Sequence, residues 1–164
     1  MSKGSLPLWR MASAGDLTFI ERIADEIHVE FPERPEVFAE KFELFAQGWF
    51  VLERDHNVVG YAICHPWRLH SIPPLDAFLG RLPVTPDCLF IHDVAIVTEA
   101  RGNGSAGRLV NTLARLALPL DLTFLALVSV YQTDSFWARY GFRVTAKLKT
   151  YGARAKYMIS ELVK

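Results

Sequence analysis

The sequence has few cysteines and no excess of charge of either sign. Its 164 residues include two cysteines, Cys64 and Cys88, which form no CxxC pair. We expect them to stay reduced, because disulfides form in oxidising compartments and nothing here indicates secretion. Eighteen basic residues balance eighteen acidic ones. This balance supplies no overall field that would hold the chain on nucleic acid or on a membrane, so neither is expected as a partner.

Long apolar runs are also missing. No run reaches the roughly 20 residues of a membrane span, and residues 1–16 lack the apolar core of a signal peptide. A cytoplasmic location is therefore expected. The five histidines form no i, i+4 pair and have no neighbouring cysteine pair, so no metal site is expected either.

The residues that are present predict one compact α+β domain over residues 1–164. Hydrophobic residues make up 51% of the chain, which suits a single core. Apolar periodicity and turn residues place the elements along the chain. Strands are expected at residues 8–12, 49–52, 58–64, 88–97, 122–130, 142–148 and 155–162, and helices at residues 17–27, 35–47, 106–117 and 133–140. Residues 53–57 are expected to form a hairpin turn, and this order of elements favours a mostly antiparallel sheet.

A glycine-rich stretch, EARGNGSAGRLV at residues 99–110, follows the strand at 88–97. Gly102, Gly104 and Gly107 fit G-x-G-x-x-G, which is typical of dinucleotide-binding turns. Such a turn follows the first strand of a βαβ unit, and an acidic residue ends the next strand. Here two helices and three strands come first, and Asp121 lies before the next strand. No Lys-Ser or Lys-Thr follows the glycines, which also argues against a P-loop.

The local physics of this stretch still favours an anion. A strand ends, a glycine-rich loop lets N–H groups converge, and a helix begins whose free amides and dipole attract negative charge. Arg101 adds a permanent cation that suits phosphate oxygens. The alternative is that the glycines merely permit a tight turn between strand and helix.

Residues 101–106, RGNGSA, resemble the acetyl-CoA pyrophosphate signature of the GCN5-related N-acetyltransferase (GNAT) superfamily, (Arg/Gln)-x-x-Gly-x-(Gly/Ala). DVAIVTEA at 93–100 resembles the fourth strand of that family, and FWARYGF at 136–142 resembles its late Phe-Tyr-x-x-x-Gly-Phe segment. The resemblance implies a GNAT-like fold with a mixed sheet of six to seven strands and about four helices. It also implies that strands four and five splay apart around acetyl-CoA.

The resemblance assigns residues to the cosubstrate by their position in the family motifs. The backbone of Val94, Ala95 and Ile96 would pair with the pantetheine arm as a further strand would. The loop and the start of its helix would hold the pyrophosphate through Arg101, Gly102, Asn103, Gly104, Ser105, Ala106 and Gly107. Trp137 stands where the family often has a tyrosine close to the cosubstrate.

Acetyl transfer needs a neutral amine, and a lysine-like amine is neutral in only about one molecule in 2,500 at pH 7. A base is therefore a large help. Where the family often places a glutamate on the fourth strand, this sequence has His92, whose imidazole can accept a proton near neutral pH. Asp93 is the second candidate base, and a merely packed histidine is the alternative.

Protonation of the leaving thiolate is the less well defined step. The indole of Trp137 cannot act as a general acid. Tyr131 is the nearest substitute, with Tyr140 and Tyr151 as others, and each has a structural role as its alternative. Because the pKa of a thiol is about 8.5, coenzyme A can leave as the thiolate without a dedicated acid.

These inferences favour an acetyl-CoA-dependent N-acetyltransferase that moves an acetyl group to a primary amine by direct attack. The acceptor is expected to be a small molecule or a peptide, and a local acidic rim of Glu33, Glu36 and Glu40 could recruit its cation. A catalytically silent acetyl-CoA sensor or interaction module is the main alternative, and nucleotide binding is a third. The last strands could also pair across a homodimer if their edge is exposed.

Overall fold

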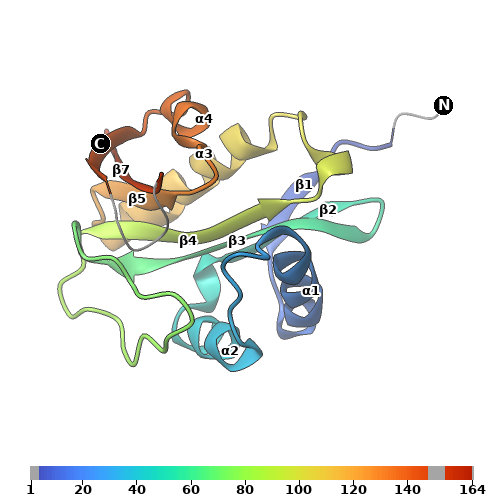
Figure 1. Ribbon diagram of the computed structural model, residues 1–164, viewed down its shortest axis with the longest axis horizontal. Coiled ribbons are helices and arrows are strands. Elements are labelled where there is room, and N and C mark those ends of the chain that lie inside the picture. Colours follow the sequence, from blue (N-terminus) through green and yellow to red (C-terminus); the bar gives the residue numbers. More distant parts are fainter. Residues whose placement is uncertain (1–3, 148–153, 164) are drawn as a thin grey trace. The chain divides into compact units, whose positions relative to one another are not determined.

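The computed structural model describes residues 4–147 and 154–163 (Figure 1). The predicted order of strands and helices is confirmed in this part of the chain. The strands are β1 (Leu8–Met11), β2 (Trp49–Arg54), β3 (Asn57–Trp67), β4 (Cys88–Ile96), β5 (Phe124–Ser129), β6 (Arg143–Lys147) and β7 (Lys156–Glu161). The α-helices are α1 (Leu17–Ile27), α2 (Pro35–Leu44), α3 (Ser105–Ala117) and α4 (Asp134–Ala138). Single turns of 3-10 helix lie at Ala14–Asp16, Ala46–Gly48, Thr98–Ala100 and Leu118–Leu120.

The strands form a seven-stranded sheet in the order β1-β2-β3-β4-β5-β7-β6. Antiparallel ladders join β1 to β2, β2 to β3, β5 to β7 and β6 to β7. The ladder of β4 with β5 is parallel and aligns Cys88 to Ile91 with Phe124 to Leu127, while β4 itself continues to Ile96. The predicted fold class, a mixed and mostly antiparallel α+β sheet of six to seven strands with about four helices and a splay between strands four and five, is therefore confirmed.

The β2–β3 hairpin corrects one prediction. The turn was expected over residues 53–57, but β2 runs to Arg54 and β3 starts at Asn57. The two turn residues, Asp55 and His56, both have positive φ, at 50° and 64°. This is the backbone of a two-residue hairpin, whose twist matches that of the flanking strands. The end of the predicted strand at 142–148, Leu148, lies outside the described residues.

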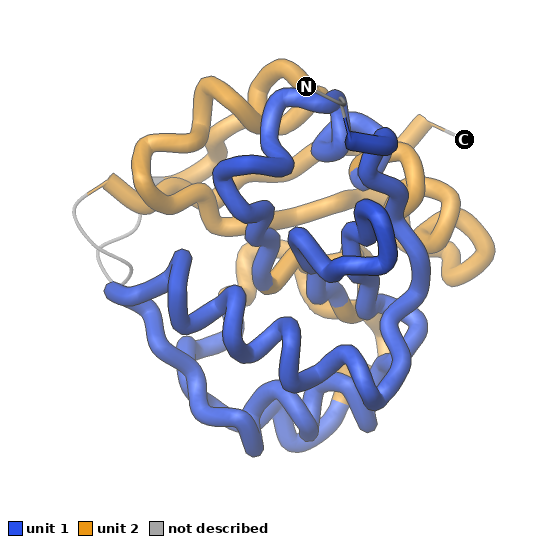
Figure 2. Tube along the Cα trace, turned by 90° about the vertical axis from the view of Figure 1, so that its right-hand side faces the viewer, with its two compact units in different colours: residues 1–64, 73–81, 93–109 blue, residues 65–72, 82–92, 110–164 orange. Residues whose placement is uncertain are grey.

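The chain divides into two compact units, which are coloured separately in Figure 2. Unit 1 comprises Met1–Cys64, Pro73–Arg81 and Asp93–Leu109. In its core, α1 and α2 pack on β2, β3 and the end of β4 (Figure 1). The buried members of this core are Ile20, Ile23, Ala24, Phe38, Trp49, Val51, Tyr61, Ile63 and Ala95. Trp49 meets Phe38 and Phe42 of α2 edge to face, so these aromatic side chains of α2 pack in the core of unit 1.

Unit 2 comprises His65–Ile72, Leu82–His92 and Val110–Lys164. A separate buried cluster contains Cys88, Phe90, Ala126, Tyr157 and Ile159. Both cysteines are buried and free, as expected, and burial raises the pKa of Cys88 to about 12. No helix among the described residues has the length and apolar character to span a membrane. A single acetyltransferase domain over residues 1–164 stays a prediction.

Candidate functional site

The segment that leads into α3, together with the first three residues of that helix, belongs to unit 1, and we call residues 101–107 the anion loop. Gly102 and Gly104 have φ values of 82° and 71°, the left-handed region that favours glycine. A Cβ built on Gly102 would meet no atom within 4 Å, so the outer side of the loop is open. Because α3 begins at Ser105, Gly107 lies in its first turn, where N–H groups have no partner within the helix.

Two arginines hold the anion loop. Arg101 donates from Nε to the carbonyl of Ile96 at 2.8 Å. Arg108, which no sequence motif singled out, donates to the carbonyl of Asn103 at 2.7 Å and to Oγ of Ser105 at 2.9 Å. Each side chain fixes the loop backbone and also brings a permanent positive charge next to it.

The first strand supports the anion loop from another part of the sequence. The indole of Trp9 in β1 donates to the carbonyl of Ser105 at 2.8 Å. The carbonyl of Pro7 accepts from Arg108 at 2.9 Å. Two residues that lie about a hundred positions earlier in the sequence thus fix the start of α3. Sequence spacing gives no signal for such contacts.

The end of β4 leads into the anion loop and carries the residues predicted to pair with pantetheine. Ala95 is 4% exposed and packs in the core of unit 1, whereas Val94 and Ile96 are half-buried. The carbonyl of Ile96 already accepts a hydrogen bond from Arg101. The backbone of Val94 bonds the His28 imidazole, so both Val94 and Ile96 have a backbone group engaged within the chain.

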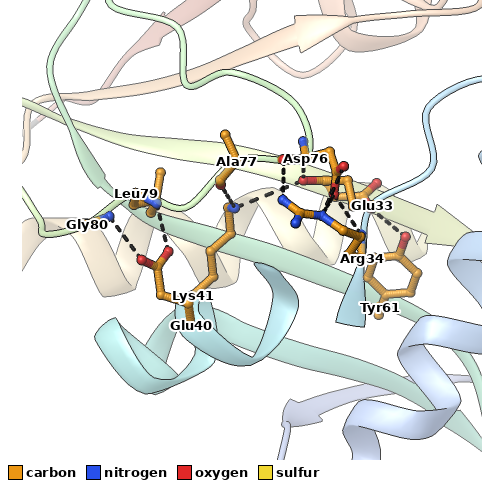
Figure 3. Close-up of polar contacts among 10 residues, drawn as sticks. Glu33, Arg34, Glu40, Lys41, Tyr61, Asp76, Ala77, Leu79 and Gly80 are labelled. Atoms are coloured by element: carbon orange, nitrogen blue, oxygen red, sulfur yellow. Dashed lines mark hydrogen bonds and ion pairs between the residues drawn. The ribbon is translucent and has the colours of Figure 1, made fainter. Parts of the chain in front are cut away.

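Asp93, just before this segment, lies at the centre of a polar cluster in unit 1. The hydroxyl of Tyr61 in β3 (Figure 3) donates to Oδ2 of Asp93 at 2.6 Å. Nε2 of His28, the residue after α1, lies 2.7 Å from its Oδ1. Both oxygens of this largely buried carboxylate are therefore engaged, by side chains from two other elements.

The ionisable partners of Asp93 have altered pKa values. Burial lowers the pKa of His28, but the Asp93 carboxylate, the Val94 backbone and Glu33 raise it, and the net pKa lies above its usual value. Burial, together with the charge of Asp93, raises the pKa of Tyr61 well above its usual value. Tyr61 therefore stays a neutral donor, and protonated His28 is favoured beside Asp93.

His92, the predicted base, belongs to unit 2 and has a different set of neighbours. Its ring centroid lies 6.1 Å from that of His65 and 6.4 Å from that of Phe90. His65 is buried, and its Nδ1 lies 3.1 Å from the carbonyl of Pro66. His92 is thus half-buried in an aromatic cluster that holds a second imidazole.

The two other predicted residues also lie in unit 2. Tyr131 is 47% exposed and has a φ of 53°, which is uncommon for a residue other than glycine. Trp137 is buried in α4, and its ring lies edge-on to those of Phe136 and Phe142, at centroid distances of 5.2 and 5.6 Å. Its side chain therefore packs in a small aromatic cluster of this unit.

Residues 73–81, which belong to the long loop between β3 and β4, are fastened to α2 within unit 1. We call this contact the loop junction: residues 73–81 held by Glu33, Arg34, Glu40 and Lys41 (Figure 3). Nζ of Lys41 donates to the carbonyl of Ala77 at 3.2 Å and lies 4.0 Å from Oε2 of Glu33. The Lys41 side chain is 1% exposed. Burial lowers its pKa, although the carboxylates around it oppose that shift.

Charged side chains also hold the outer part of the loop junction. Arg34 donates from Nε to Asp76 at 3.1 Å and from its second terminal nitrogen to the Asp76 carbonyl at 3.0 Å. Glu40 accepts from the amides of Leu79 and Gly80 at 2.7 and 3.0 Å. The carboxylates of Glu33 and Glu40 accept hydrogen bonds from the loop backbone. They therefore do not form, with Glu36, the acidic rim that was expected.

Residues 4–147 and 154–163 contain no group of three or more His, Cys, Asp or Glu side chains placed to hold a metal ion. His28, Tyr61 and Arg108 were missed by sequence reasoning. His28 and Tyr61 contact a residue far away in the sequence and belong to no recognisable motif. Arg108 lies within the glycine-rich stretch at 99–110 and contacts Asn103 and Ser105 there, as well as the distant Pro7. Asp93 was predicted as the second candidate base, and the structure shows that Tyr61 and His28 bind its carboxylate.

A comparison with family models matches residues 17–142 to the acetyltransferase (GNAT) family. No curated protein matches the sequence. Among solved structures, Ard1 from Thermoplasma volcanium is similar with a TM-score of 0.76 and 16% identity, covering 98% of this chain and 100% of that one. Naa50 from Arabidopsis thaliana, solved with the bisubstrate analogue CoA-Ac-MVNAL, gives 0.67 and 12%, covering 94% and 97%.

A longer protein is similar over part of its length. N-acetylglutamate synthase from Neisseria gonorrhoeae, solved with coenzyme A and N-acetyl-glutamate, has a TM-score of 0.71 and 18% identity, covering 99% of this chain and 36% of that one. At these identities the structural likeness establishes the fold. Since the family model spans most of the sequence, the chain belongs to the GNAT family of acetyltransferases.

Proposed function

We propose that the protein is an acetyl-CoA-dependent N-acetyltransferase that moves an acetyl group to a primary amine by direct attack. The observation that carries this proposal is the anion loop. It presents two left-handed glycines, the amino end of α3 and two arginines on one open stretch of backbone. Backbone amides and helix termini of this kind suit a pyrophosphate.

The chain's own residues fit this cosubstrate in two places. Gly102 and Gly104, with Asn103, Ser105, Ala106 and Gly107, would supply amides to the pyrophosphate, and Arg101 and Arg108 would add charge. The backbone of Val94 and Ala95, with the N–H of Ile96, would pair with the pantetheine arm. The carbonyl of Ile96 would stay bonded to Arg101.

Acetyl-CoA, when bound, supplies a thioester. The amine nitrogen bonds to its carbonyl carbon, the carbon–sulfur bond breaks, and coenzyme A leaves as the thiolate. The amine must lose a proton, and we assign that proton to His92, with Asp93 as the alternative base. Tyr131 is the proposed donor to the thiolate, and Trp137 is proposed to line the cosubstrate site.

We propose an amino acid or a peptide amino terminus as the acceptor. Two similar structures support this choice: one was solved with coenzyme A and N-acetyl-glutamate, and another with the bisubstrate analogue CoA-Ac-MVNAL. A small amine from another class is the alternative. A catalytically silent acetyl-CoA sensor is the second candidate function, which the tryptophan at position 137 favours because it lacks an acidic hydroxyl.

Steady-state release of the CoA thiol, measured with amino acids, polyamines and short peptides, tests the proposal. We expect turnover with at least one acceptor, and a loss of roughly 10²- to 10⁴-fold in kcat for His92→Ala. Tight acetyl-CoA binding without transfer to any acceptor would favour the sensor. A larger thermal shift with NAD or ATP than with acetyl-CoA would favour nucleotide binding. Such shifts are measurable, because any ligand at 100 times its Kd adds about 2.7 kcal/mol to the free energy of unfolding.

A further inference from the structure

We propose that His28 is a positioning residue for acetyl transfer: it holds Asp93, and with it the start of the pantetheine-pairing segment, from the end of α1. This inference rests on the proposed function and deepens it. His28 is not part of any motif in the sequence. The structure nevertheless places its imidazole on the residue that immediately precedes Val94.

The geometry of the cluster supports this role. His28 follows the last residue of α1, and its amide donates to the carbonyl of Ala24 at 2.8 Å. Its Nε2 lies 2.7 Å from Oδ1 of Asp93, and the hydroxyl of Tyr61 lies 2.6 Å from Oδ2. The carboxylate is therefore clamped between α1 and β3, and cannot turn without breaking one of the two contacts.

The position of His28 also suits a positive charge. The carboxyl end of a helix favours a cation, because its last carbonyl groups lack partners within the helix. The groups that act on the imidazole are the Asp93 carboxylate, the backbone of Val94 and the carboxylate of Glu33. Tyr61 faces the same carboxylate from β3 as a neutral donor. The side chains of His28 and Asp93 are 14% and 13% exposed, so water screens the pair only in part.

The sign of the pH dependence follows from this arrangement. His28 is charged below its pKa, which is raised in the folded protein. The stabilisation by the ion pair is therefore fully present below the ordinary histidine pKa and is lost as pH rises through the folded value. Above that range the imidazole is neutral and holds Asp93 less strongly, so the Asp93–Val94 segment is less well fixed.

The test compares His28→Asn with His56→Asn, a matched change at an exposed histidine in the β2–β3 turn. KM for acetyl-CoA and kcat are measured at about pH 6 and at about pH 9, on either side of the imidazole titration. We expect His28→Asn to raise KM about tenfold at the lower pH, the effect of losing a hydrogen bond to a charged group. We expect a change of less than about twofold at the higher pH. His56→Asn should change neither value.

A second measurement does not depend on activity. NMR titration of the His28 imidazole should give a lower pKa in Asp93→Asn than in the unmodified protein, and it decides the point even if His28→Asn fails to fold. An equal effect of His28→Asn on KM at both pH values, or an unshifted His28 pKa in Asp93→Asn, would overturn the positioning role alone. Absence of both acetyl-CoA binding and CoA release in the unmodified protein would overturn the proposed function, and this role with it.

Discussion

The anion loop and the loop junction both belong to unit 1 but are built in opposite ways. The anion loop consists of backbone whose shape depends on left-handed φ values at Gly102 and Gly104. The loop junction consists of charged side chains of α2 and the residues before it, which bind the backbone of residues 73–81. We infer that the first region is sensitive to backbone changes and the second to changes of charge.

The largest effect is expected from Lys41→Met in the loop junction. This change leaves the Glu33 carboxylate, which is 5% exposed, without its buried cation. Breaking a buried ion pair on one side costs about 3 kcal/mol, or on the order of 10 °C in Tm for a domain of this size. Thermal unfolding of the variant, monitored by circular dichroism, measures the loss.

The control for this prediction is Lys156→Met. Lys156 pairs with Asp134 at 2.7 Å, but both side chains are 29% exposed. We expect a much smaller loss, because exposed ion pairs contribute little. Equal losses in the two variants would show that burial does not set the cost at the loop junction.

A smaller loss of stability, together with weaker binding of acetyl-CoA, is expected from Gly102→Ala in the anion loop. Left-handed backbone costs alanine roughly 1–2 kcal/mol, so the loop backbone should move toward another conformation. We therefore expect KM for acetyl-CoA to rise about tenfold. Gly80→Ala is a matched control, because Gly80 has a φ of 76° and equally open space for a Cβ. The two variants should lose similar stability, and only Gly102→Ala should raise KM. A rise in KM in both would remove the distinction between the two regions.

The smallest effect is expected where a side-chain contact lies close in sequence. Arg10 donates to both oxygens of Asp16 at 2.8 and 3.0 Å, and it lowers the pKa of Asp16 to about 2. This stabilisation is present above the ordinary pKa of aspartate and is lost as pH falls through about 2. Because Arg10 is 41% exposed, we expect Asp16→Asn to cost only about 1 kcal/mol at neutral pH.

Urea unfolding of Asp16→Asn and the unmodified protein across the acid range would test this sign. The difference in unfolding free energy should shrink as pH falls below about 4, where the ordinary carboxyl begins to take up protons. A difference that is independent of pH would contradict the lowered pKa of Asp16, because the hydrogen bonds from Arg10 and from Ser13 both favour the ionised carboxylate.

These contrasts also explain what the sequence could predict. Element order follows from apolar periodicity, so α1, α3 and β4 were predicted within a residue or two of their observed bounds. The anion loop was predictable because left-handed turns require glycine at fixed positions. The β2–β3 turn was predicted too long, because Asp55 and His56 take positive φ without a glycine to mark them.

The polar clusters could not be predicted in the same way. Lys41 contacts Ala77, and His28 contacts Asp93, across separations set by the fold rather than by any local period. A lysine within an amphipathic helix pattern is usually solvated, and nothing in the sequence of α2 marks Lys41 as buried. The sequence of residues 73–81 likewise does not show which charged side chains hold this segment.

The most direct test of the account is an NMR titration of the backbone amides of residues 102–107 with acetyl-CoA. We predict saturable shifts of these amides and of Val94 and Ala95, with smaller or no shifts when NAD is added instead. Unchanged anion-loop amides at saturating acetyl-CoA, or the same shifts with NAD, would contradict the claim that this loop binds the pyrophosphate of the acetyl donor.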